Sequence, residues 1–518
     1  MLAQILSARP TGGLKLTDEE LLASAIDPVM LEDGSSLAQV NPVKQTESVT
    51  NKKRAEMWSA NVSLTWEIIK GLTFRTAATY NTTNNRIDKF YKEGSKEAFR
   101  NGQKPYGDTQ MGRDLRWTNS NQLTWKQKIN KKNSYDIMLG HEISYRSNEY
   151  LLGQAMDFPV DYLGNNNLGL GATPSKVVTD FGDKKLLSFF ARGNYNYDNR
   201  YLLTATVRAD GSTVFSKKNK WGFFPSFSAA WRVSEEAFMK DISWLSNFKV
   251  RLGWGIDRIS NYLSLDLYQN NRYGIGNSLV TVLTPKQIKN QNLKWEGSSS
   301  VNLGVDLGFF DSRLNFTADF FIKNTKDLLL AQELAHVTGH STQYQNIGKI
   351  QNRGIELNLS STNIQTKSFT WSTNFNISFI RNELKSLESG ANYKTTRSGF
   401  DGNFTQDDYI AMVGSSLGLI YGYEFDGIYQ SSDFYIDGYT DANNPKYILK
   451  EGVVNNTRYT DADGLRPGVV KYKDQNGDGI ITSEDRTVIG NALPKWYGGI
   501  TNTFNYRGID LSFMFQFN

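Results

Sequence analysis

The feature that most constrains this chain is an alternation of apolar and polar residues with a period of two. It is clearest between Val301 and Phe309, where every second residue is apolar, and it returns from Leu314 to Ile322. Successive side chains of a β-strand point to opposite faces of a sheet, so each segment is predicted to be a strand with one apolar and one polar face. The short polar break between them predicts an antiparallel hairpin.

The same hairpin pattern recurs from Asn61 to Phe517 and predicts about seven hairpins, or about fourteen strands. Connections within hairpins are short and those between hairpins are long, and the longest runs from 381 to 494. The strand before this excursion runs toward the side of the long loops and the strand after it runs back, so the excursion lies on that side. Its extended runs 421–429 and 469–472 are predicted to form a local sheet. This rhythm of loop lengths is typical of outer-membrane barrels. Alternation alone fits a soluble β-sandwich equally well.

Composition narrows the range of functions. The 518 residues carry a formal net charge of +5, no cysteine and 13% aromatic residues. A net charge this small over 518 residues does not predict a basic surface for binding nucleic acid. The lack of cysteine excludes disulfide scaffolds and thiolate zinc sites. No run of about 18 apolar residues predicts a transmembrane helix, and residues 1–30 contain no secretory signal. A barrel chain without such a signal is expected to be a fragment or to begin at an internal methionine.

Several separate motifs resemble those of one known family, the SusC-like TonB-dependent outer-membrane transporters of Bacteroidetes. They are RADGSTVF at 208–215, NLKWE at 292–296, NIGKIQNRGIEL at 346–357 and DQNGDGIITSEDRTVIGNALPKWYGG at 474–499. The motifs occur in the family's order, and the resemblance covers about residues 58–518.

This resemblance implies an all-β fold, an antiparallel transmembrane barrel of which the chain supplies about fourteen of about twenty-two strands. It also implies an outer-membrane nutrient importer for glycans or peptides, closed by a SusD-like surface lipoprotein and driven by TonB through a plug. Residues 1–57 are predicted to be an N-terminal segment with a short helix joining the missing plug side, and 58–518 the partial barrel in outer-membrane lipid. The alternatives are a secreted soluble binding or adhesin module and an inactive gene fragment.

The sharpest local motif follows the spacing of a calcium loop. Candidate ligands occupy positions 1, 3, 5, 7, 9 and 12, with Gly479 at the turn position. They are Asp474, Asn476, Asp478, Ile480 through its carbonyl, Thr482 and Asp485. Because Asp485 stands where such loops have a bidentate glutamate, weak binding is expected. The alternative is an Asx-rich surface turn without metal. The sequence predicts no required cofactor, and calcium is the only candidate.

Four tyrosines of the long excursion are candidates for stacking on a sugar ring or meeting the lid, with ordinary packing as the alternative: Tyr421, Tyr423, Tyr429 and Tyr435. Nothing predicts an enzyme. Glu235 and Glu236 are adjacent and cannot flank one glycosidic bond. The sequence contains no nucleophile elbow, P-loop or base-flanked serine.

Overall fold

The computed structural model describes residues 42–518 apart from 94, 96, 99–103, 260–267, 276–277, 286, 289, 341, 388–389, 399–405, 442–443 and 457–463. No helix in this part of the chain is long and apolar enough to cross a membrane. The chain divides into two compact units. Unit 1 is Met1–Lys126, Ile137–Ala191 and Arg208–Gly222, and unit 2 is Gln127–Asp136, Arg192–Val207 and Phe223–Asn518.

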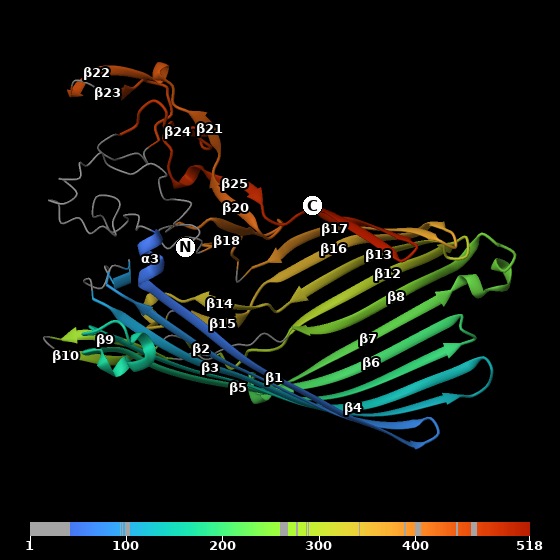
Figure 1. The fold of residues 1–518 in the computed structure, drawn as a ribbon. Coiled ribbons are helices and arrows are strands. Elements are labelled where there is room, and N and C mark those ends of the chain that lie inside the picture. Colours follow the sequence, from blue (N-terminus) through green and yellow to red (C-terminus); the bar gives the residue numbers. More distant parts are fainter. Residues whose placement is uncertain are drawn as a thin grey trace. The chain divides into compact units, whose positions relative to one another are not determined.

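Fourteen strands are hydrogen-bonded in sequence order, which confirms the predicted antiparallel sheet and its number of strands (Figure 1). They are β1 (Val49–Ile69), β2 (Leu72–Tyr91), β3 (Tyr106–Lys128), β4 (Asn133–Met156), β5 (Thr173–Tyr197), β6 (Tyr201–Ser212), β7 (Trp221–Arg232), β8 (Leu245–Ile259), β12 (Glu296–Phe309), β13 (Leu314–Lys326), β16 (Lys349–Gln365), β17 (Phe369–Ser386), β26 (Trp496–Tyr506) and β27 (Ile509–Phe517).

Shorter elements occupy the connections. The strands among them are β9 (Tyr268–Ile275), β10 (Ser278–Pro285), β11 (Gln287–Ile288), β14 (Leu329–Glu333) and β15 (Thr342–Asn346). The helical ones are α3 (Pro42–Ser48) and the 3-10 turns η1 (Gly164–Leu170), η2 (Lys217–Asn219), η3 (Val233–Glu235), η4 (Ala237–Met239), η5 (His336–Thr338), η6 (Ser431–Asp433) and η7 (Ser483–Asp485).

In unit 1 the first hairpin is longer than its apolar pattern. β1 begins at Val49, opposite Tyr91 of β2, whereas the predicted barrel boundary is residue 58. The ladder continues through polar residues because backbone hydrogen bonds, which carry no side-chain signature, hold it together. The hairpin closes at Gly71, whose φ of +86° suits glycine and whose Cβ would lie 2.4 Å from the Lys126 carbonyl oxygen. The short helix predicted within 1–57 from residues 17–26 lies outside the described residues.

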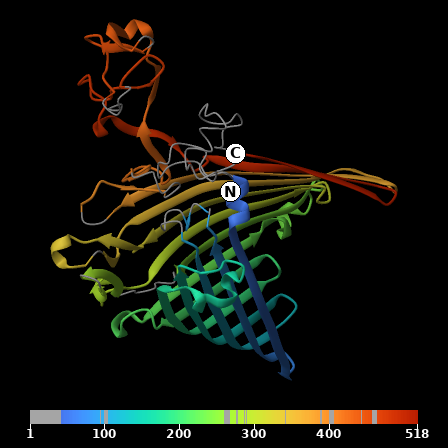
Figure 2. The ribbon, with the colours of Figure 1, turned by 60° about the vertical axis from the view of Figure 1, so that its left-hand side comes forward.

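In unit 2 the hairpins β12–β13, β16–β17 and β26–β27 have short turns, and Figure 2 shows these turns gathered at one end of their strands. In the first turn Phe310, Asp311 and Ser312 all have positive φ. Register is continuous across the sheet: Leu303 lies opposite both Leu252 of β8 and Phe320 of β13. The apolar residues of neighbouring strands therefore share one face.

The excursion 381–494 adds no strand between its flanking strands, because β17 pairs directly with β26 through Phe379 and Trp496. This pairing is what one continuous excursion requires, and its extracellular side stays a prediction. Within the excursion, three small sheets form from β18 (Tyr393–Thr396), β19 (Tyr409–Met412), β20 (Leu419–Tyr423) and β25 (Arg486–Asn491), from β21 (Phe425–Ile428) and β24 (Val470–Tyr472), and from β22 (Phe434–Asp441) and β23 (Asn444–Leu449). The β21–β24 pair is the predicted local sheet.

Candidate functional site

The apolar face of each unit is exposed instead of forming a core. In unit 1, Trp58 and Trp66 of β1 are 67% and 59% exposed, although both are paired with β2 in a long ladder. In unit 2, Val301 and Leu303 are 45% and 46% exposed. Large exposed apolar surfaces mark contact with a partner or a membrane, and aromatic residues at both ends of such a face are typical of lipid-facing strands.

The opposite, polar face of unit 2 is tied together by an ion-paired cluster that spans three strands. Arg251 of β8 donates from Nε and Nη2 to the two carboxylate oxygens of Asp306 on β12, at 2.8 and 3.0 Å. Its Nη2 also reaches Asp319 of β13 at 3.1 Å. Such forked charge-assisted bonds fix the guanidinium in one orientation. Alternation predicted that Asp306 faces the polar side, but the pairing depends on strand order and register.

Gly304 makes room for this cluster. It is the ladder neighbour of both Arg251 and Asp319, and a Cβ there would lie 2.6 Å from Arg251 Cζ and from Asp319 Oδ1. Because real Cβ atoms do not approach so closely, a side chain at this position and the Arg251–Asp319 contact exclude each other. The glycine in the alternating pattern is therefore a specific requirement of the polar face.

Unit 1 has a comparable cluster at the RADGS motif. Arg208 donates to Asp210 at 2.9 Å, to Glu142 of β4 at 3.1 Å and to the Ser188 hydroxyl of β5 at 2.9 Å. Asp210 is completely buried. Gly211 follows it with a virtual Cβ only 3.0 Å from the Trp221 ring. The motif therefore has a structural role, in which one arginine links three strands.

The calcium-loop residues lie between β24 and β25, where their side-chain oxygens accept hydrogen bonds from backbone N–H groups. Asp474 accepts from Gly477 and Gly479 at 2.6 and 2.7 Å, and Asp478 accepts from Ile480 at 2.8 Å. Asn476 accepts from the N–H of Asp478, Thr482 from that of Glu484, and Asp485 from those of Gln475 and Thr482.

No group of three or more His, Cys, Asp or Glu side chains is placed to hold a metal in the part of the chain that the structure describes. The carboxylates of the loop instead close a turn, for which Gly477 and Gly479 supply positive φ values of +77° and +83°. A cation would have to compete with these amides for the same oxygens. This arrangement favours the alternative of an Asx-rich turn, and calcium binding stays a prediction.

The four candidate tyrosines have different environments. Tyr429 is 1% exposed, and its hydroxyl donates to the Val454 carbonyl oxygen at 2.5 Å, so it is a packing residue. Tyr421 is partly buried with the Arg486 guanidinium 4.3 Å from its ring centre, and Tyr423 packs on Tyr472 at 5.2 Å. Tyr435 is 63% exposed. Tyr435 is thus the best placed of the four to meet a ligand or a lid.

A hollow of about 980 Å³ in unit 2 was not predicted. It is lined by Phe320, Ile355 and Phe379 of the apolar face, by Arg353 and Arg381 on the same face, and by residues of the excursion that include Leu419 and Leu493. Sequence alternation places these arginines on the apolar side of β16 and β17. The hollow itself arises only where the excursion folds over the strand ends.

The chain matches the family model described as "TonB dependent receptor-like, beta-barrel" over residues 11–508. TonB-dependent receptor P3 of Formosa agariphila is 32% identical over 483 residues, which are 91% of this chain and 45% of that protein. TonB-dependent receptor SusC of Bacteroides thetaiotaomicron is 32% identical over 398 residues, or 74% of this chain and 35% of SusC. The chain thus spans less than half the length of either relative.

A solved structure of the RagAB peptide transporter shares the fold, with a TM-score of 0.74 over 94% of this chain and 50% of the other, at 21% identity. The expected fold, the exposed apolar face and the family match agree. The chain belongs to the TonB-dependent receptor β-barrel family, resembles its SusC-like members, and is a protein of the bacterial outer membrane.

Proposed function

We propose that this chain forms barrel wall and extracellular loops of a SusC-like importer that carries glycans or peptides across the outer membrane. The observation that carries the proposal is the division of one sheet into an exposed apolar face and an ion-paired polar face, in a chain that belongs to this family. A lipid-facing outer surface and a wet inner surface are what a transport barrel requires. The name of the structural neighbour, the RagAB peptide transporter, supports peptides as a substrate class, and glycans are what the resemblance to SusC-like transporters implies.

The inner face supports passage of a polar solute. Arg251 and Lys249 balance Asp306 and Asp319, and Arg208 balances one of the two carboxylates of Asp210 and Glu142. These side chains therefore present hydrogen-bonding groups with at most one unbalanced charge in each cluster. A wall of this kind solvates a sugar or a peptide and does not trap it electrostatically. The proposed partners are a SusD-like surface lipoprotein over the extracellular loops and TonB acting through a plug.

The test is uptake by cells in which the gene that contains this chain is deleted. Deletion is expected to abolish uptake of either labelled oligosaccharides or labelled peptides, and deletion of TonB is expected to have the same effect. The intact gene supplied in trans should restore uptake in the first strain only. Unchanged uptake of both substrate classes after deletion contradicts the proposal.

The exposed tyrosine gives a finer test. Tyr435→Ala is expected to lower uptake or association with the SusD-like lipoprotein without unfolding the excursion, because 63% of the side chain is exposed. The matched control is Tyr439→Ala in the same strand β22, where the side chain is 66% exposed. Equal effects of the two variants would remove Tyr435 from the proposed contact surface.

A further inference from the structure

The outer side of unit 1 has an aromatic row across three strands. Trp58 of β1 and Tyr80 of β2 lie on the apolar face, and Tyr80 is the ladder partner of Trp117 on β3. Trp66 lies eight residues further along β1, next to the short turn at Gly71. Eight residues span roughly 27 Å along a strand, which a tilt of about 40° reduces to roughly 20 Å across the membrane, close to the apolar band of about 25 Å between two aromatic girdles. Because short turns are periplasmic, Trp58 marks the extracellular girdle.

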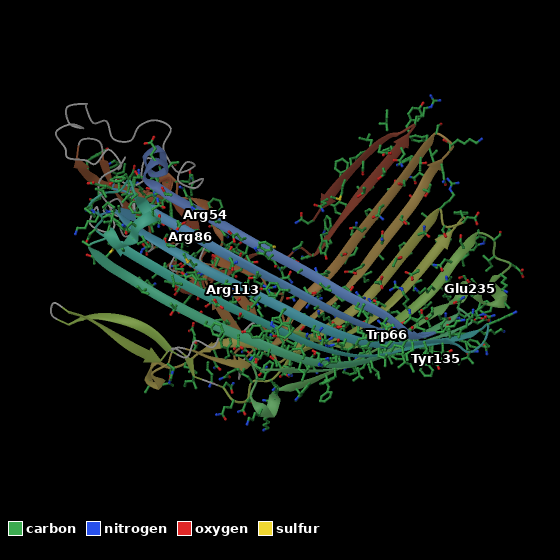
Figure 3. The ribbon with its side chains drawn as sticks, turned by 60° about the horizontal axis from the view of Figure 1, so that its bottom comes forward. Arg54, Trp66, Arg86, Arg113, Tyr135 and Glu235 are labelled. Carbon is green, nitrogen blue, oxygen red and sulfur yellow. The ribbon has the colours of Figure 1, made fainter. Side chains whose placement is uncertain are left out.

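Three arginines lie beyond this girdle on the same face. Arg54 is four residues before Trp58, so it is displaced by roughly 13 Å along the strand toward the extracellular side. Its ladder partner is Arg86 of β2, whose partner on β3 is Met111, and Arg113 follows two residues later. Figure 3 shows Arg54, Arg86 and Arg113 toward one end of these strands and Trp66 at the other. Their level is that of the lipid headgroups.

These cations are only partly neutralised by the protein. Arg86 donates from Nε to both oxygens of Asp88, at 3.0 and 2.9 Å. Arg54 and Arg113 have neither an ion pair nor a hydrogen bond among the described residues, and both are exposed. Two carboxylates, Glu56 and Glu149, lie on the same face and are likewise unpaired within the described chain. The surface therefore offers guanidinium donors and carboxylate acceptors side by side.

Two adjoining hollows give this surface an amphiphilic shape. The outer one, about 520 Å³, is lined by the three arginines, Glu56, Glu149 and Asn84 among others. The second, about 620 Å³, shares Asn84 and Arg113 with the first and continues down to Trp58 and Tyr80. In its wall the Thr82 hydroxyl is buried without a hydrogen-bond partner among the described residues. The occupant should be anionic at its outer end and apolar below.

We propose that this surface binds the phosphorylated sugar headgroup of lipid A, the glycolipid of the outer leaflet. Guanidinium groups bind phosphate oxygens through forked, charge-assisted hydrogen bonds. Glu56, Glu149 and Asn84 can accept hydrogen bonds from sugar hydroxyls, which a simple phospholipid headgroup offers in smaller number. The aromatic row below would contact the sugar and the start of the acyl chains.

Unit 2 independently has two adjacent arginines just beyond the apolar part of its outer face. Arg353 of β16 and Arg381 of β17 are direct ladder partners, two residues outward from the apolar pair Ile355 and Phe379. Like charges directly opposite each other destabilise a sheet, so an anion bound between the two guanidinium groups would relieve their repulsion. Neither arginine has an ion-pair partner among the described residues. Glu383, two residues from Arg381 on the same strand, interacts electrostatically with both arginines but is itself paired with Lys385 at 2.6 Å. Unit 2 thus also carries two neighbouring guanidinium groups that the protein compensates only in part.

The experiment measures lipid A bound to the protein expressed in its own outer membrane and purified in mild detergent. The Arg54→Gln/Arg113→Gln variant is expected to bind lipid A about tenfold more weakly than the wild type, since two charge-assisted contacts are removed. The matched control, Lys70→Ala/Lys126→Ala, removes two positive charges at the turn end of the same hairpins and should bind as the wild type does. Heat-modifiable migration on gels verifies that each variant is folded.

A second arm uses the wild-type protein alone, so that the result does not depend on a variant folding. Lipid A should bind about tenfold more tightly than its dephosphorylated form, and inorganic phosphate at about 10 mM should not displace it, since a headgroup also uses the sugar and acyl contacts. Equal binding of the two lipids, or full displacement by phosphate, overturns the proposal. So does an arginine variant that binds as the wild type does. The inference rests on membrane orientation, and its readout involves no transport, so it can fail separately from the importer proposal.

Discussion

Replacing Gly304 with alanine should destabilise the sheet by breaking one ion pair of the polar face. The added Cβ would lie 2.6 Å from Arg251 Cζ and Asp319 Oδ1, and both are ends of flexible side chains. The backbone can therefore stay in place while the 3.1 Å contact between Arg251 and Asp319 is lost. A hydrogen bond between charged groups contributes about 1.5–3 kcal/mol when buried.

That figure must be reduced because the groups are partly solvated. The side chains of Arg251 and Asp319 are 30% and 19% exposed, and water will compensate part of the loss. We expect Gly304→Ala to lower the free energy of unfolding by about 1–2 kcal/mol. The assay is denaturant unfolding of the protein in lipid vesicles, followed by tryptophan fluorescence.

Gly253→Ala is the matched control. Gly253 lies on β8, two residues from Arg251, and nothing lies within 4 Å of its virtual Cβ. This variant should be neutral or slightly stabilising, by up to about 1 kcal/mol, because it restricts the unfolded chain. In the Asp319→Ala background, Gly304→Ala should lower the free energy of unfolding by much less, because the contact that it breaks is already absent. Equal effects of both glycine substitutions, or an unchanged cost in that background, would refute the reasoning.

The remaining predictions concern the long excursion. Tyr429→Ala should make the excursion more sensitive to protease, since truncation of a buried aromatic side chain lowers stability by about 3–5 kcal/mol. Tyr435→Ala should leave the protease resistance of the excursion unchanged, because the side chain is exposed. Burial raises the pKa of the Asp485 carboxyl, but N–H groups of Thr482 and Gln475 lower it more, so the net pKa is lowered. The stabilisation of the excursion by ionised Asp485 should be complete above about pH 4 and be lost as the pH falls through the lowered pKa. Limited proteolysis of the excursion from pH 7 to 3 measures this loss. A cleavage rate that does not change with pH would contradict the prediction. Calorimetry decides between the calcium loop and the metal-free turn that the hydrogen bonds of Asp474 favour. Heat at millimolar calcium that Asp474→Ala removes would support the calcium loop, and absence of heat with the wild type would end the calcium hypothesis.

Much of the architecture could be predicted because strand alternation is a local property. Val301–Phe309 and Leu314–Ile322 had one possible periodicity, and their short break allowed only an antiparallel hairpin. Strand ends were less predictable. The hairpin pattern predicts a connection over 84–113, yet β2 continues to Tyr91 and β3 begins at Tyr106. Strands held by backbone ladders need no apolar alternation outside the membrane.

Candidate sites were harder to predict, because a motif specifies residue types and not their contacts. The spacing of Asp474, Asp478 and Asp485 suits a calcium loop, yet in the fold their carboxylates accept from backbone amides. Tyr429 and Tyr435 look alike in sequence, yet one is buried and the other exposed.

The sequence by itself determined which face each strand residue occupies, the order and direction of the hairpins, and membership of the family. Only the tertiary structure decided which charges meet. Arg251 reaches Asp319 across 68 positions because register sets both beside Gly304, and Arg54 lies near Arg113 for the same reason. Alternation is imposed on each residue by its own strand, whereas contacts across a ladder depend on a register that is fixed jointly by all the strands.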